Sequence, residues 1–195
     1  MTSLDNVLAR ARTATGHGIL YWIGTGGTDP SAALPGRPTP VGRIWSTLDV
    51  AQQQEFLPLA QAAGIAVTNP DLVLDACDCS GYVCWALGFA RQTPAGEWID
   101  TNYIWNDAKG HQRRFQELAQ ARPGALVVYP KAGSNENFGH VGIVVEADAQ
   151  GRATLVAHCS ADNFKSAPYD SIKITSPDKF LEQKASIYAW CRDVV

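Results

Sequence analysis

The sequence has no excess of positive charge, no long apolar run and no dense set of cysteines. Its 16 Lys and Arg residues are outnumbered by 19 Asp and Glu residues, giving a net charge of −3. No basic cluster is longer than Arg113-Arg114. This balance argues against a protein whose main partner is nucleic acid. No apolar stretch is long enough for a transmembrane helix, and residues 1–20 contain no apolar core of a Sec signal peptide.

The chain has 195 residues, of which 46% are apolar and 18% charged. This composition is not that of a disordered chain or a coiled coil. The length is typical of one domain with a sizeable core. We therefore expect a single domain over residues 1–195, synthesised in the cytoplasm without a Sec signal.

The cysteines are few and odd in number, so at least one thiol is free or pairs outside the chain. Their density is far below that of a disulfide-stabilised scaffold, and reduced thiols are the expected state. One bridge involving Cys191 or Cys77 remains an open alternative. The five cysteines are Cys77, Cys79, Cys84, Cys159 and Cys191.

Hydrophobic periodicity predicts helices first and strands afterwards, which indicates an α+β domain with an antiparallel sheet. The segment from Gly16 to Pro40 is rich in turn residues, and its glycines lack the Lys and Ser/Thr that end a phosphate-binding loop. The expected helices are 3–13, 47–63, 83–90, 100–108 and 111–121. The expected strands are 125–129, 140–146, 152–158 and 185–191, with a fifth within 168–175.

The segment Asp78-Cys79-Ser80-Gly81-Tyr82-Val83 lies where a loop becomes a helix. Asp78 is a good N-cap and places Cys79 in the first turn. There the helix dipole favours a thiolate, the nucleophilic form of cysteine, so a lowered pKa is expected. Gly81 is expected to leave room for a substrate. The alternative is that Cys79 is a small buried apolar residue.

Two of the four histidines lie at strand ends where they could serve such a thiol. His140 begins one strand and His158 ends the next. If the hairpin turn is centred on Ala149, the two face each other directly, with Cβ atoms about 4.5–5.5 Å apart. One imidazole could then act as base while the other orients it. The alternative is two unrelated histidines at strand ends.

These residues, with Pro123-Gly124 before a strand, resemble the NlpC-type bacterial cell-wall endopeptidases. The resemblance covers roughly residues 77–160 and implies a papain-like cysteine peptidase core, with the nucleophile at a helix N-terminus packed on an antiparallel sheet. It implies Cys79 as nucleophile, His140 as base and His158 as the residue that orients the base.

The upstream part of the sequence also resembles the family, with departures. Tyr21, ahead of paired glycines, resembles a tyrosine beside the nucleophile, and Tyr21 and Ser80 are the candidate substrate or oxyanion residues. The stretch between Tyr21 and Cys79 is much longer than in the family, so we expect an insertion at roughly 28–75 that reshapes the cleft. Ala125 stands where the family has an acidic residue after Pro-Gly.

The resemblance implies a hydrolase that cleaves amide bonds in peptidoglycan stem peptides through a thioester, without a cofactor. Three alternatives remain: a same-fold acyl hydrolase or acyltransferase with a non-wall substrate, a non-catalytic binding module, and a zinc cluster. The residues that could be drawn as that cluster are Cys77, Cys79, Cys84, His158 and Cys159.

The lack of a Sec signal makes action in the periplasm or cell wall dependent on another export route. Single-domain wall hydrolases of this kind resemble effectors injected by contractile secretion systems, or phage lysis enzymes. An effector would have a cognate immunity protein as its partner.

Overall fold

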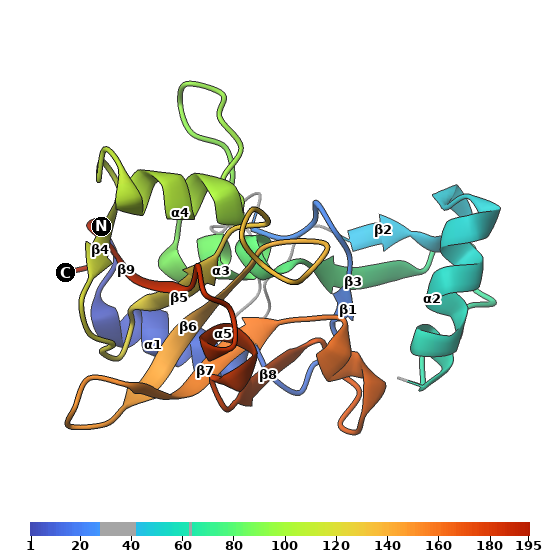
Figure 1. Ribbon diagram of the computed structural model, residues 1–195. Helices are drawn as coiled ribbons and strands as arrows, with labels where there is room; N and C mark the ends of the chain where they lie inside the picture. The colour runs from blue at the N-terminus through green and yellow to red at the C-terminus, as the bar shows by residue number, and fades with distance from the viewer. Residues whose placement is uncertain (28–41, 63) are drawn as a thin grey trace.

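The computed structural model describes residues 1–27, 42–62 and 64–195. At its centre is a six-stranded antiparallel sheet with the strand order β4-β9-β5-β6-β7-β8 (Figure 1). The strands are β4 (Phe115–Leu118), β5 (Leu126–Tyr129), β6 (His140–Ala147), β7 (Ala153–Cys159), β8 (Ile172–Thr175) and β9 (Ile187–Cys191). The expected α+β class and the five predicted strands are confirmed.

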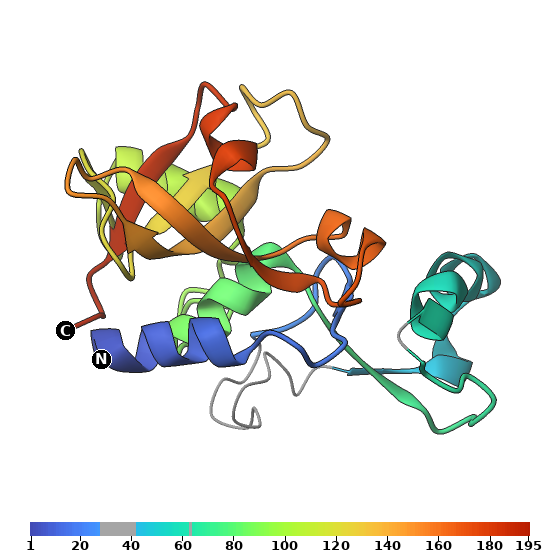
Figure 2. The same cartoon turned by 90° about the horizontal axis from the view of Figure 1, so that it is seen from below.

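Three helices cover one face of this sheet: α1 (Leu4–Thr13), α3 (Cys79–Leu87) and α4 (Thr101–Lys109) (Figure 2). Ser3 caps α1 by accepting a hydrogen bond from the Asn6 N–H. Every residue of α3 is buried, as its uniformly apolar sequence predicts. The main core therefore lies between α3 and the apolar residues of β6 that point toward it, such as Val141 and Ile143.

A second, smaller apolar cluster lies on the other face of the sheet. The short helix α5 (Asp178–Leu181) places Phe180 there, against Tyr129, Val144 and Val156. Residues of β6 with even numbers face this cluster, because successive side chains of a strand alternate between the two faces. His140 begins β6 on this side, in ring contact with Phe180.

The expected helix at 111–121 is wrong, because this segment contains the edge strand β4. Phe115 of β4 pairs with Cys191 of β9, and its ring is fully buried. The Asp107 carboxylate accepts hydrogen bonds from the N–H groups of Arg113, Arg114 and Phe115. These bonds satisfy backbone donors just before the strand, an arrangement that helical periodicity does not reveal.

A three-stranded sheet that the sequence did not predict precedes α3, the helix that begins with Cys79. Strand β3 (Val73–Cys77) pairs in parallel with β1 (Leu20–Tyr21) and antiparallel with β2 (Gly42–Ile44). The 3-10 helix η1 (Trp45–Thr47) then leads to α2 (Val50–Ala62), which lies apart from the large sheet (Figure 1). The ring of Phe56 from α2 stacks on Trp22 at 4.3 Å.

The predicted insertion at 28–75 lies partly outside the described residues, which omit 28–41 and 63. Its described part forms β2, η1, α2 and the beginning of β3. Helix α2 continues through Pro58 and is followed by Gly64, which has a positive φ of 73°.

Candidate active site

The nucleophile candidate Cys79 lies at the first position of α3, directly after β3. The Asp78 carboxylate caps this helix by accepting a 2.7 Å hydrogen bond from the Gly81 N–H, as the sequence predicts. Cys79 is only 5% exposed, but it lines a cavity of about 190 Å³ together with Tyr21, Trp98 and others. Cys79 is therefore a buried residue at the wall of this cavity.

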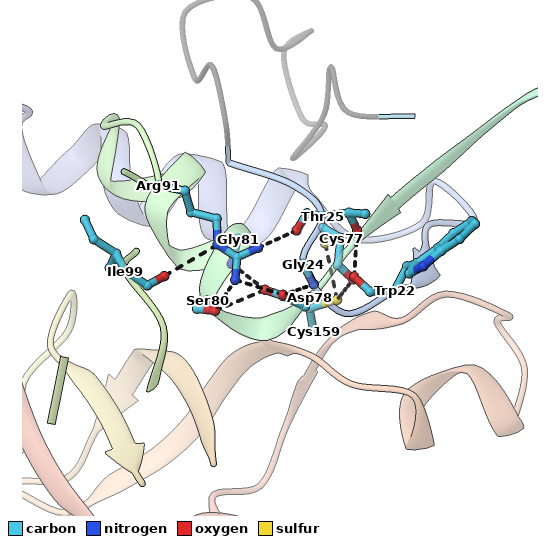
Figure 3. A network of polar contacts seen from close by, with 10 residues as sticks. All are labelled: Trp22, Gly24, Thr25, Cys77, Asp78, Ser80, Gly81, Arg91, Ile99 and Cys159. Carbon is cyan, nitrogen blue, oxygen red and sulfur yellow. Dashed lines mark hydrogen bonds and ion pairs between the residues drawn. The ribbon is translucent and has the colours of Figure 1, made fainter. Parts of the chain in front are cut away.

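Asp78 also belongs to a buried polar network centred on Arg91 (Figure 3). The guanidinium of Arg91, 2% exposed, contacts the Asp78 carboxylate at 2.8 Å and the Ser80 hydroxyl at 2.7 Å. It also donates to the Thr25 carbonyl at 2.9 Å, and Asp78 accepts the Gly24 N–H at 2.7 Å. The network thus fastens the loop that contains Gly24 and Thr25 to the helix start that bears Cys79.

Gly81 serves close packing rather than substrate access, which corrects the expectation from the sequence. A Cβ atom at this position would lie 2.2 Å from the Thr25 carbonyl oxygen. A Cβ on Gly27 would lie 2.3 Å from the carbonyl oxygen of Gly81, and Gly27 has a positive φ of 66°. The paired glycines of this loop and Gly81 therefore allow two backbone segments to touch.

The β6–β7 hairpin differs in register from the prediction. Ile143 pairs with Ala157 and Val144 with Val156, so His158 lies opposite Gly142 and diagonal to His140. The turn is centred one residue later than expected, because Asp148 accepts hydrogen bonds from the N–H groups of Gln150 and Arg152. Shifting the centre by one residue shifts the pairing by two, which leaves both imidazoles on the same face.

The two imidazoles are in direct contact, and their hydrogen bonds assign the tautomers. His140 Nε2 lies 2.8 Å from His158 Nδ1, and His158 Nε2 lies 3.0 Å from the Thr175 hydroxyl. That hydroxyl donates its proton to the Ser176 carbonyl, so it accepts from His158 Nε2–H. His158 Nδ1 then accepts from His140 Nε2–H, which leaves the lone pair of His140 on Nδ1.

Phe180 holds this pair from the side. Its ring stacks on His140 with a centroid distance of 5.1 Å and meets His158 edge-on at 5.5 Å. Gly142 makes room for His158, because a Cβ there would lie 3.0 Å from the His158 Cβ and 2.5 Å from Val156. The imidazole orientation is thus fixed by packing as well as by hydrogen bonds.

Cys79 and His140 line two adjoining cavities. His140 lines a cavity of about 240 Å³ that shares Tyr21, Ile23, Phe138 and Gly139 with the cavity over Cys79. The N–H of Val141, the residue after His140, acts to lower the pKa of the Cys79 thiol. Among the described residues, His140 Nδ1 has no hydrogen-bond partner.

The segment that contains the thiol and the imidazole pair is similar to a known protein family. Residues 73–159 match the CHAP domain. CHAP domains are papain-like cysteine peptidases and amidases, and the match spans a little under half of the chain. It begins with β3 and ends with β7, so it contains Cys79, His140 and His158. The papain-like class expected from the motifs is confirmed.

No curated protein matches the chain. Two solved structures are similar, those of Ly7917 with the hydrolyzing product of MDP and of Ly7917. Their identities to the chain are 15% and 14%, with TM-scores of 0.40 and 0.36. Each alignment covers 97% of this chain and 63% of the other, so the chain spans under two thirds of their length.

The ionisation of Cys79 and His140 differs from the thiolate expected from the sequence. Burial raises the pKa of the Cys79 thiol, and the Asp78 carboxylate raises it further, whereas the Val141 N–H and Arg91 act in the opposite direction. Burial lowers the pKa of His140 well below 6.5, with His158 as the next cause. The predicted lowered thiol pKa is therefore wrong for the resting state, in which thiol and imidazole are both neutral.

The two candidate substrate or oxyanion residues have different surroundings. Tyr21 of β1 lines both cavities, and burial followed by the nearby Cys79 raises the pKa of its phenol. Parallel pairing of Tyr21 with Cys77 places it there despite the long intervening stretch. The Ser80 hydroxyl donates to Asp78 and accepts from Arg91. Ser80 also lines the cavity over Cys79, with its hydroxyl engaged in the buried network.

The residues drawn as an alternative zinc cluster do not gather into a site. Within residues 1–27, 42–62 and 64–195, no group of three or more His, Cys, Asp or Glu side chains could hold a metal ion.

Within these same ranges, no helix is long and apolar enough to cross a membrane. Likewise, no described residue between 42 and 75 lines either of the cavities beside Cys79 and His140.

Sequence reasoning missed Arg91, Thr175 and Phe180. Arg91 follows the glycine that ends α3, and nothing local indicates burial beside Asp78. Thr175 lies at the end of the weakest predicted strand, and its role depends on the neighbouring strand. Phe180 belongs to a four-residue helix, too short for a periodic signal.

Proposed function

We propose that the protein is a cysteine amidase or peptidase that hydrolyses amide bonds in peptidoglycan stem peptides. The observation that carries the proposal is the hydrogen-bonded His140–His158 pair, lying in a cleft that adjoins the capped helix start with Cys79. The CHAP match over these residues supports a hydrolase of the papain-like class.

Acylation begins with proton transfer from the neutral thiol of Cys79 to Nδ1 of His140 as the sulfur attacks the amide carbonyl. The backbone N–H of Cys79, at the start of α3, is the donor available to the developing oxyanion. The imidazolium then protonates the leaving amine, and the C–N bond breaks to give a thioester. His158 accepts the His140 Nε2–H throughout and stabilises the transient positive charge.

Deacylation reverses these roles. His140, again neutral, takes a proton from a water molecule that attacks the thioester carbonyl. The tetrahedral intermediate collapses to a carboxylic acid and expels the sulfur of Cys79, which takes the proton back from the His140 imidazolium. The His140 imidazole makes each proton transfer with the thiol, the leaving amine or water, so neither step needs a cofactor.

Digestion of purified peptidoglycan sacculi tests this proposal. The wild type should release muropeptides whose masses identify a cleaved amide bond. Cys79→Ala should lower the rate about a thousandfold or more, as loss of a nucleophile does, whereas Cys84→Ala is the matched control at another buried cysteine of the same helix. Release of acyl transfer products, or equal activity of the two variants, would contradict the proposal.

We further infer that the protein acts on the wall side of the cytoplasmic membrane. Production in a Gram-negative host with and without an added Sec leader tests this inference. Lysis should require the leader and an intact Cys79. Equal toxicity without the leader would point to a cytoplasmic substrate instead. If the protein is an injected effector, co-production of its immunity protein should prevent lysis.

A further inference from the structure

We propose that Cys77 and Cys159 form a disulfide bond that joins the nucleophile segment to the large sheet. Their sulfur atoms lie 3.2 Å apart although the residues are separated by 82 positions in sequence. Both side chains are fully buried, and both lie next to the Asp78 network (Figure 3). Their contact spans two different sheets, so it results from the tertiary fold and not from proximity along the chain.

The two cysteines occupy corresponding places beside the candidate active site. Cys77 ends β3, two residues before Cys79, and Cys159 ends β7, directly after His158. A covalent bond here would tie the strand that leads to the nucleophile to the strand that bears the orienting histidine. No other pair of cysteines among the described residues has its sulfur atoms in contact.

The polar surroundings of the pair suit either redox state. In the reduced state the Cys159 thiol donates to the Cys77 carbonyl at 3.2 Å, with the Ser171 hydroxyl at 3.4 Å. Bond formation removes the thiol donor, and the Ser171 hydroxyl already donates to the Ile19 carbonyl at 2.7 Å. Oxidation therefore leaves no buried donor without a partner in this group.

The oxidant we propose is another disulfide, either a small molecule such as oxidised glutathione or a thiol–disulfide oxidoreductase. One protein thiolate attacks this disulfide and releases one thiol. The second protein thiolate then attacks the mixed disulfide, releases the second thiol and leaves the Cys77–Cys159 bond. Two protein thiols are oxidised and one external disulfide is reduced.

Burial makes this exchange slow in the folded protein. The pKa of Cys77 is raised by burial and by its hydrogen bond with Cys159, and exchange requires a thiolate that the oxidant can reach. We therefore expect the bond to form while the chain folds in an oxidising compartment.

Refolding tests the bond directly. Denatured, reduced protein is refolded in a mixture of oxidised and reduced glutathione, then acid-quenched, alkylated, digested and mapped by mass spectrometry. The Cys79→Ala variant removes the cleft thiol, so the remaining thiols are followed without competition. We expect a linked peptide pair containing Cys77 and Cys159, with Cys84 and Cys191 alkylated. The melting temperature should rise by roughly 5–10 °C over the reduced sample.

Matched variants complete the test. Cys84→Ala should keep the linked pair and the shift in melting temperature, whereas Cys159→Ala should lose both. If Cys159→Ala does not fold, the peptide map of the Cys79→Ala protein still decides the question. Four alkylated thiols in that protein, or a link through Cys84 or Cys191, would overturn the proposal. Because that protein lacks the nucleophile, this result is independent of whether the protein cleaves peptidoglycan.

Discussion

Thr175 sets the positions of the protons in the imidazole pair, although it contacts neither the thiol nor the cleft. Its hydroxyl accepts from His158 Nε2–H because its own proton goes to the Ser176 carbonyl. Because His158 Nε2 carries the proton, His158 Nδ1 accepts from His140 Nε2–H, and the lone pair of His140 lies on Nδ1. In the proposed reaction, Thr175 is therefore a positioning residue.

Replacing this hydroxyl tests the inferred tautomers. Thr175→Val keeps the shape but leaves His158 Nε2–H without its acceptor, so kcat/KM should fall roughly tenfold. Thr175→Ser should keep most activity. The measurement is the pH dependence of kcat/KM, with the melting temperature of both variants as a control for stability. Equal kcat/KM values for Thr175→Val and the wild type would show that another group fixes the His158 ring.

The neutral resting state predicts how the thiol of Cys79 reacts with iodoacetamide. Burial raises the pKa of Cys79 and lowers that of His140, so little thiolate is present at neutral pH. Alkylation should accelerate as the pH rises above 8, without a plateau below neutrality. A plateau below pH 7 that His140→Ala abolishes would instead reveal a thiolate–imidazolium pair.

At the scale of elements, α3 and α4 begin with the same type of cap but in different electrostatic surroundings. Asp78 accepts from the Gly81 N–H at 2.7 Å, and Asp100 accepts from the Tyr103 N–H at 2.8 Å. Only Asp78 is also paired with a buried arginine, Arg91. The two caps therefore form a matched comparison for the buried ion pair.

Alanine at each cap separates the contribution of the ion pair from that of capping. Asp100→Ala should lower the free energy of unfolding by about 1 kcal/mol, the usual value of a cap. Asp78→Ala should cost about 3–5 kcal/mol, because it also leaves the buried Arg91 charge without its partner. Urea denaturation followed by circular dichroism measures both. Similar losses of unfolding free energy would mean that water or a backbone carbonyl replaces Asp78 as the partner of the Arg91 guanidinium.

The elements that were predictable from sequence are those whose local pattern and tertiary environment agree. Helix α1 has its cap and apolar face in the sequence, and α3 has its apolar run. Strand β4 was mistaken for a helix because each of its residues pairs with a residue of β9 at least 70 positions away. The register of β6 and β7 was off by two because one carboxylate, Asp148, shapes the turn.

At the scale of the whole molecule, the site depends on contacts between distant segments. Cys79, His140 and His158 could be named from motifs, and the resemblance also indicated Tyr21. The Arg91 network could not, since Thr25, Asp78 and Arg91 share no local pattern. No local pattern in the sequence predicts that β3 lies between β1 and β2. That arrangement brings the loop with Thr25 and Gly27 onto the start of α3.

Burial of the imidazole pair also makes the stability of the whole molecule dependent on pH. Burial lowers the pKa of His158 from 6.5 to about 4, so between these values the unfolded chain binds a proton that the folded protein does not. The stabilisation is fully present above pH 6.5 and is lost as the pH falls toward 4. At pH 4.5 the loss due to His158 should reach about 2–3 kcal/mol.

Comparison of the wild type with His158→Asn isolates this contribution, because the carboxylates that titrate in the same range are present in both proteins. Free energies of unfolding from urea titrations at pH 7 and pH 4.5 give the loss for each. The wild type should lose about 2–3 kcal/mol more than the variant between these pH values. Asparagine cannot be protonated, yet it can still accept from His140 Nε2–H, so the comparison changes the titration while retaining a hydrogen-bond acceptor. Equal losses would mean that His158 is as easily protonated in the folded protein as in the unfolded chain, and its assignment as a neutral acceptor would fail.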